Sequence, residues 1–162
     1  MKSLSRILLF FLILTAWRCG ASRSVNLHEL PNYQTQAPQI VFLDLKVKKG
    51  AGDTETVTLD NAILGKGEIR RQLTMATSAV QIRTVAVDSA GRTVETWHVD
   101  HPLHREVEVA SPGGQMERRK LAVDEGVFSL RFQADPRIQK LVFYRVEAGK
   151  KPKVLYTLRL KP

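Results

Sequence analysis

Apolar and polar side chains alternate residue by residue over much of this chain, and this pattern restricts its fold more than any other feature of the sequence. Successive side chains of a β-strand point to opposite faces, so an alternating segment forms a strand with one buried face. The alternation is clear in three segments, whose apolar positions are Val41, Leu43, Leu45 and Val47, then Phe128, Leu130 and Phe132, then Val154, Tyr156, Leu158 and Leu160. No segment after the N-terminal region has the spacing of an amphipathic helix, so we expect an all-β domain.

Two further details of the pattern indicate how the strands are used. Residues 141–144 (Leu-Val-Phe-Tyr) are apolar on both faces, as expected of a central strand. The alternation changes phase between residues 80–82 and residues 85–87, and such a change predicts a β-bulge. Turn signals recur about every 8–12 residues. We therefore predict an antiparallel β-sandwich of about 7–9 strands over residues 39–162.

One short motif resembles the turns of a known group of sandwich domains. Residues 85–92 read Val-Ala-Val-Asp-Ser-Ala-Gly-Arg. Asp88 has a carboxylate suited to capping a turn, and Gly91 is suited to the left-handed conformation that returns the chain to the next strand. The segment resembles the A-x-D-x-A-G-N hairpin of bacterial immunoglobulin-like and fibronectin-like domains, with Arg92 in place of the usual Asn. The resemblance implies an immunoglobulin-like sandwich and implies no particular activity.

The N-terminal residues predict export. Lys2 and Arg6 precede the entirely apolar residues 7–14, and this order is typical of a secretory signal peptide. The apolar run is shorter than the roughly 20 residues that a membrane-spanning helix needs. We assign residues 1–21 to a signal peptide. Residues 22–38 are polar, contain two prolines and show no periodicity, so we assign them to a flexible tether.

The processing site admits two interpretations. The small residues at positions 19–21 predict cleavage after Ala21. Alternatively, Cys19 becomes the acylated first residue of a lipoprotein, although Arg18 departs from the small residue that usually precedes such a cysteine. Cys19 is the only cysteine of the chain, so the predicted domain has no disulfide, no thiolate nucleophile and no cysteine ligand for zinc.

The chain has a positive net charge, and this charge limits the class of partner that it is expected to bind. Removal of the signal peptide removes Lys2, Arg6 and Arg18, which lowers the net charge from +9 to +6. For an exported protein, the expected partner is an envelope protein or an anionic envelope polymer rather than nucleic acid. Contact with a membrane is expected only if Cys19 is acylated.

The densest group of candidate metal ligands lies at residues 97–104, Trp-His-Val-Asp-His-Pro-Leu-His. His98, His101 and His104 recur at every third position with Asp100 among them, and imidazoles suit zinc, copper or nickel. Because a strand alternates its faces, these side chains converge only if a turn separates them. A metal site is therefore one hypothesis, beside a pH-sensitive surface and simple exposed histidines. Nothing else in the sequence requires a cofactor.

Two sets of residues are candidates for surface contact with a ligand. Trp97 is the one aromatic residue beside a predicted turn, so it is the candidate for stacking on a carbohydrate. Arg118, Arg119 and Lys120 form a basic run near predicted turns, and they are candidates for binding an anionic polymer.

The sequence contains no recognised catalytic motif. It has no nucleophile elbow, no metalloprotease helix, no phosphate-binding loop and no dinucleotide fingerprint. We therefore expect an exported, non-catalytic sandwich that binds an envelope protein or serves as an accessory subunit. Two alternatives are a carbohydrate or anionic-polymer binding module and a metal-binding protein or hydrolase that uses residues 98–104.

Overall fold

A computed structural model of the chain describes residues 22–33, 38–70, 76–121 and 123–161. Regular structure in these residues is almost entirely β, with one short 3-10 helix, η2, at Leu27–Glu29. The strands are β1 (Ser22–Asn26), β2 (Gln39–Lys49), β3 (Glu55–Lys66), β4 (Val80–Val87), β5 (Thr93–Asp100), β6 (Glu106–Ala110), β7 (Met116–Lys120), β8 (Glu125–Gln133), β9 (Lys140–Glu147) and β10 (Lys153–Lys161). No helix in the described residues is long and apolar enough to cross a membrane.

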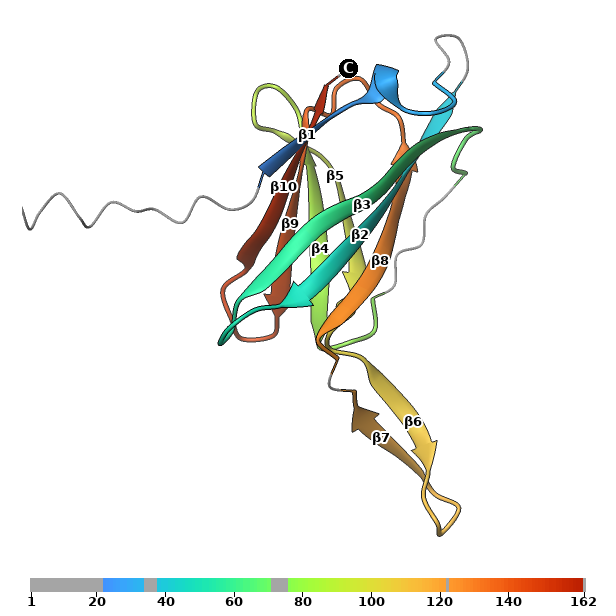
Figure 1. Cartoon of the computed structure of the whole chain (residues 1–162), viewed down its shortest axis with the longest axis vertical. Coiled ribbons are helices and arrows are strands. Elements are labelled where there is room, and N and C mark those ends of the chain that lie inside the picture. Colours follow the sequence, from blue (N-terminus) through green and yellow to red (C-terminus); the bar gives the residue numbers. More distant parts are fainter. Residues whose placement is uncertain (1–21, 34–37, 71–75, 122, 162) are drawn as a thin grey trace, which may run out of the picture.

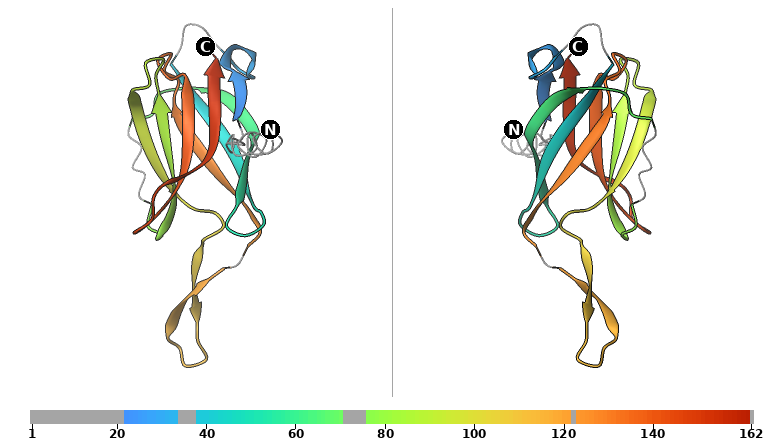
Figure 2. Two further views of the ribbon diagram at one scale, coloured as in Figure 1. Left: turned by 90° about the vertical axis from the view of Figure 1, so that its left-hand side faces the viewer. Right: turned by 90° about the vertical axis from the view of Figure 1, so that its right-hand side faces the viewer.

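The strands form three sheets, of which two face each other and one stands apart (Figures 1 and 2). The larger sheet has the order β1-β10-β9-β4-β5, and the smaller facing sheet has the order β3-β2-β8. Strands β6 and β7 pair only with each other, and this hairpin extends away from one end of the sandwich in every view. The described chain is thus sandwich-like and all-β, as the alternation predicts.

The core lies between the two facing sheets and is made by the inward positions of the alternating segments. Val154 is the exception, since it is exposed and Leu155 is buried where the register of β10 against β9 shifts between Val154 and Tyr156. Phe143 of the larger sheet meets Phe128 of the smaller one edge to face, with ring centroids 6.1 Å apart. Burial of each large apolar side chain contributes about 1.5–3 kcal/mol. The central strand of the smaller sheet contributes four side chains with no exposed surface, Val41, Leu43, Leu45 and Val47.

The larger sheet has the expected interior strand, but the bulge predicted within residues 80–87 is not in β4, the strand that contains them. Strand β9, which contains residues 141–144, lies inside the sheet between β10 and β4, as its two apolar faces predict. The register of β4 against β5 shifts between Ala86 and Val87. The extra residue of this bulge is Val94 of β5, because Ala86 pairs with Glu95 and Val87 pairs with Thr93. β4 itself keeps one phase, since its polar Thr84 is buried between Ile82 and Ala86, and this is why the apolar pattern alone places the bulge in the wrong strand.

The turn between β4 and β5 has the capped geometry that its sequence predicts. The carboxylate of Asp88 accepts hydrogen bonds from the backbone of Ala90 at 2.9 Å and of Arg92 at 2.8 Å. The backbone bond from Arg92 is the main reason that the pKa of Asp88 lies below its ordinary value. Gly91 has a φ of 82°, in the left-handed region where glycine is favoured.

The segment that the sequence predicts to be a tether is partly built into the sheet. Ser22–Asn26 form β1, which pairs in parallel with β10. The tether assignment is wrong for these residues, because the backbone of β1 pairs with the edge of β10 and Val25 packs against the core. One apolar residue in a polar strand gives no periodic signal. Residues 1–21, with the predicted cleavage at Ala21 and the possible acylation of Cys19, lie outside the described residues.

Candidate functional site

The connection between β5 and β6 is folded back onto the sandwich at the end from which the hairpin extends. The backbone N–H of His101 donates to the carbonyl of Val80 at 3.1 Å, and that of His104 donates to the carbonyl of His101 at 3.0 Å. Pro102 and Leu103 are buried between the two histidines. The turn therefore holds its side chains against the body of the protein.

A glycine in β8 makes this close packing possible. A Cβ atom at Gly126 would lie 2.8 Å from the Cβ of Pro102 and 3.1 Å from its carbonyl oxygen. Backbone atoms cannot move aside as a flexible side chain can, so only glycine fits at this position. Gly126 thus sets how close the connection lies to the smaller sheet.

We expect Gly126→Ala to destabilise the protein by about 1–3 kcal/mol, because the added methyl group forces the Pro102 backbone away. Urea denaturation measures this change in the free energy of unfolding. Gly113→Ala, in the hairpin turn, is the matched control because its nearest atom would be 4.0 Å away. Equal stability of the two variants would contradict the close contact.

Three side chains that suit metal coordination meet beside this connection. They are His101 and His104 of the connection and Glu55 at the start of β3, and we refer to them as the Glu55 cluster. The Nε2 atom of His101 lies 3.0 Å from Oε2 of Glu55, and the Nε2 atom of His104 lies 3.5 Å from Oε1. Their candidate ligand atoms all lie within 4.8 Å of one another. The side chains of His101 and Glu55 are 0% and 5% exposed, whereas that of His104 is 37% exposed.

The proton on the buried imidazole is placed by its two contacts. The Nδ1 atom of His101 accepts a hydrogen bond from the backbone N–H of Leu103 at 3.3 Å. Nδ1 therefore carries no proton, and Nε2 is the nitrogen that donates to Glu55. This contact orients the imidazole ring toward the carboxylate.

An arginine of β9 links the Glu55 cluster to two other carboxylates. The Nη1 atom of Arg145 lies 2.6 Å from Oδ1 of Asp53 and 3.2 Å from Oε1 of Glu55. Its Nη2 atom lies 3.3 Å from Oε2 of Glu147. The guanidinium is 12% exposed and Glu55 is 5% exposed, so this pair is shielded from water, whereas Asp53 is largely exposed.

The surroundings fix the charge states of two members of the cluster. Burial raises the pKa of Glu55, but the hydrogen bond from His101 and the nearby Arg145 outweigh burial, and the pKa lies below its ordinary value. Burial, together with the neighbouring His101 and Arg145, lowers the pKa of His104. At neutral pH Glu55 is ionised and His104 is neutral, and these are the forms that coordinate metals.

A cavity of about 280 Å³ opens beside His104. Its wall includes three basic side chains, Lys49, Lys120 and Arg145, together with Leu103. The exposed side of the Glu55 cluster therefore faces a space large enough for water or a small anion.

Only two of the four residues in the predicted metal set belong to this cluster. His98 lies against Gln81, whose Oε1 is 3.2 Å from its Nδ1. The carboxylate of Asp100 accepts from the backbone N–H groups of Thr77 at 2.9 Å and of Ser78 at 2.8 Å. The structure therefore does not bring His98 and Asp100 into the Glu55 cluster, and each is held instead by a hydrogen bond to β4 or to the loop before it.

The prediction that Trp97 contacts a ligand at the surface is also wrong. Trp97 is 2% exposed, and its ring lies 5.2 Å from that of Phe132 in the facing sheet. It pairs with Thr84 of β4, which is also buried, so this position of β5 faces inward. The adjacent turn begins only after residue 100, too late to bring Trp97 to the surface.

The predicted basic run lies on the projecting hairpin. Arg118, Arg119 and Lys120 belong to β7 and are exposed. The positive charges of two of the three are paired with carboxylates of the hairpin, because the guanidinium of Arg118 lies 3.3 Å from the carboxylate of Glu108 and that of Arg119 lies 3.5 Å from the carboxylate of Glu117. The run is therefore a mixed-charge surface rather than a purely cationic patch.

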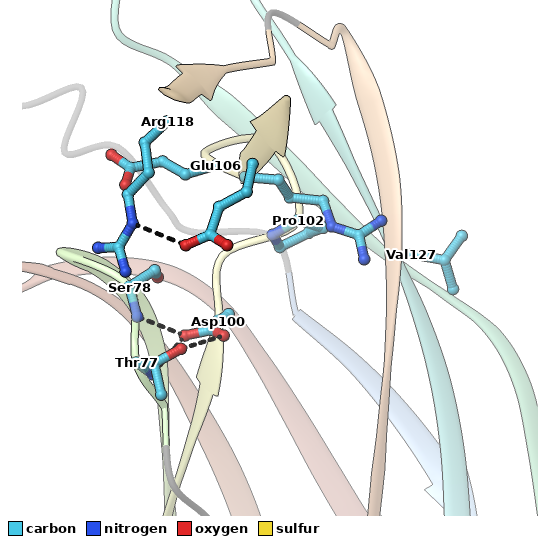
Figure 3. A pocket seen from close by; sticks show the side chains of 9 residues that line it. Thr77, Ser78, Asp100, Pro102, Glu106, Arg118 and Val127 are labelled. Atoms are coloured by element: carbon cyan, nitrogen blue, oxygen red, sulfur yellow. Dashed lines mark hydrogen bonds and ion pairs between the residues drawn. The ribbon is translucent and has the colours of Figure 1, made fainter. Parts of the chain in front are cut away.

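The base of the hairpin and the body of the sandwich enclose a notch of about 460 Å³ (Figure 3). Glu106 and Arg118 line it from the hairpin, Asp100 and Ser78 line it from the sandwich, and Val127 lines it from β8. The notch is open to solvent and combines charged side chains with an apolar one.

Glu55 and Arg145 are the site residues that sequence analysis misses. Glu55 lies 46 residues before His101, and Arg145 lies 90 residues after Glu55. Each looks like an ordinary charged residue of an alternating strand. Only the pairing of the strands brings them together, and one sequence carries no signal of that pairing.

Comparison of the chain with known protein families, with curated proteins and with solved structures finds no match.

Proposed function

We propose that this protein is an exported, non-catalytic binding module that docks onto another envelope protein through the β6–β7 hairpin. The observation that carries this proposal is that the hairpin projects from the sandwich and pairs with no other strand of the described chain (Figure 1). A two-stranded hairpin is marginally stable by itself in water. A strand from a partner protein would complete it as a sheet.

The hairpin has two open edges that suit strand addition. β6 and β7 each have five residues, and the outer edge of each offers backbone N–H and C=O groups to an extended segment. The charged side chains of β7 disfavour pairing between two copies of the hairpin, as charges on natural edge strands do. We therefore expect a different protein as the partner.

Exposed apolar side chains near the hairpin favour a protein partner over a polymer. Met116 on β7 is 63% exposed, Leu121 at the base of the hairpin is 42% exposed and Val127 in the notch is 56% exposed. They are three of the five exposed large apolar side chains in the described chain. The ion pairs within the hairpin weaken the case for an anionic polymer, and the burial of Trp97 removes the candidate for carbohydrate stacking.

The proposal includes an immunoglobulin-like arrangement of the sandwich. The order β10-β9-β4-β5 corresponds to the G-F-C-C′ order of a variable-type immunoglobulin sheet, and the pair β2–β8 corresponds to B–E. The capped turn at residues 88–92 supports the same interpretation. In such folds, partners are bound by loops and edges while the sheets form the scaffold.

Replacement of residues 106–120 by a short Gly-Ser linker tests the docking role. We expect a partner that co-purifies with the tagged wild-type protein from its own cell envelope to be lost from the variant. With the purified partner, the affinity should fall at least about 30-fold, since a central contact is worth about 2 kcal/mol or more. Isothermal titration calorimetry measures the affinity.

The control places substitutions at the opposite end of the sandwich, in the β4–β5 turn. Ser89→Lys combined with Ala90→Glu leaves the net charge unchanged and alters two exposed side chains. This variant should keep the partner. A partner that stays bound to the hairpin-replaced protein, or a wild-type protein that purifies alone, would overturn the proposed docking role.

A further inference from the structure

We propose that Glu55, His101 and His104 bind one divalent transition-metal ion, for which zinc fits best, at the base of the hairpin. This site is independent of the proposed docking role, and it differs from the residue set that sequence spacing indicates. It combines two imidazoles with one carboxylate, which is a donor set typical of zinc.

The separations of the ligand atoms suit tetrahedral coordination. Zinc–nitrogen and zinc–oxygen bonds of about 2.0–2.1 Å place neighbouring ligand atoms about 3.4 Å apart. The Nε2 atoms of His101 and His104 lie 3.0 Å and 3.5 Å from the two different carboxylate oxygens of Glu55, and the ligand atoms taken one from each residue lie within 4.8 Å of one another. The imidazole rings of His101 and His104 lie edge to face with centroids 4.8 Å apart, and binding would draw the partly exposed His104 toward the other two ligands.

Two of the three ligands are buried and one is partly exposed, and this difference favours both the entry and the retention of an ion. His101 and Glu55 are buried and already in contact with each other, so little conformational entropy is lost when they coordinate. His104 is 37% exposed and borders the cavity of about 280 Å³. With three protein ligands, the fourth position of zinc faces this cavity and takes water or a small anion.

Two contacts oppose binding and limit the affinity. Coordination through Nε2 of His101 moves its proton to Nδ1 and gives up the hydrogen bond from Leu103, whose 3.3 Å length makes it a weak one. The guanidinium of Arg145 also repels a cation and competes for Oε1 of Glu55. Arg145 keeps two other carboxylate partners, Asp53 and Glu147, after Glu55 is taken by the metal.

A metal in this position would cross-link two parts of the fold. Glu55 starts β3, whereas both histidines belong to the connection that leads from β5 into the hairpin. Coordination would therefore tie the base of the hairpin to the smaller sheet.

Calorimetric titration of the full-length protein, freed of metal with EDTA and then dialysed, with zinc chloride tests this site. We expect saturable binding of one zinc per chain and a rise in melting temperature on binding. His104→Ala should weaken binding by at least about 100-fold, because removal of groups that merely orient a ligand already costs about 10–100-fold. His104 is partly exposed, so the variant should fold, and circular dichroism confirms this.

His98→Ala is the matched control, because His98 lies nearby but outside the Glu55 cluster. It should bind zinc as the wild type does. Absence of saturable binding would overturn the site. So would weak binding at several positions that His104→Ala does not change, or loss of binding in His98→Ala with retention in His104→Ala.

Discussion

Replacement of Trp97 by alanine is expected to lower the free energy of unfolding by about 3–5 kcal/mol. The indole is 2% exposed and packs against Phe132 of the facing sheet, so its removal leaves a cavity between the sheets. A typical domain has a total stability of about 5–15 kcal/mol, so this loss removes a large part of it. Urea denaturation followed by circular dichroism measures the change.

Two further substitutions separate a core role for Trp97 from a surface role. Trp97→Phe should cost less than Trp97→Ala, since it keeps an aromatic ring and the indole N–H has no hydrogen-bond partner among the described residues. Thr96→Ala alters the exposed neighbour and should change stability by less than about 0.5 kcal/mol. A Trp97→Ala protein as stable as the wild type would show that the indole is not part of the core.

Replacement of Arg145 by methionine is expected to cost about 3 kcal/mol at neutral pH, at the lower end of the range for breaking a buried ion pair. The change leaves the carboxylate of Glu55, which is 5% exposed, without its cationic partner. The remaining hydrogen bond from His101 keeps the loss from being larger. The exposed pair of Arg119 with Glu117 supplies the control, because Arg119→Met should cost less than about 1 kcal/mol.

The pH dependence of this loss follows from the titration of Glu55. Its pKa in the folded protein lies below the ordinary value of 4.5, so the ionised carboxylate stabilises the fold above that pH. This contribution disappears as the pH falls toward the pKa of the folded state. The stability difference between wild type and Arg145→Met should therefore shrink below about pH 4.5, as urea denaturation in the presence of EDTA would show. A pH-independent difference would contradict the role assigned to Glu55.

The features that depend on local sequence were predictable. Alternation predicts β2 and β8 of the smaller sheet and β10 of the larger one, the two-sided apolar segment at residues 141–144 predicts an interior strand, and Asp88 with Gly91 predicts a capped turn. Each of these signals lies within a few residues, where side-chain direction and backbone preference act directly.

The features that depend on pairing between distant strands were not predictable. The Glu55 cluster joins residues of β3 and of the β5–β6 connection, and spacing within residues 98–104 selects the wrong companions for His101 and His104. The burial of Trp97 depends on which face of β5 meets the smaller sheet, and the irregular pattern of that strand does not reveal it. Strand β1 is ordered by the neighbouring edge of β10 rather than by its own composition.

The pairing of β1 with β10 also has a consequence for the order of events during synthesis. Ser22 lies opposite Thr157, so the first described strand has no partner in the sheet until the last described strand has been made. Pairings of such long range make folding slow, because the chain loses the conformational entropy of a large loop before the stabilising contacts form. A nascent chain that lacks β10 also leaves one edge of β9 open. The first and last described strands therefore depend on each other, and the larger sheet is complete only when both are present.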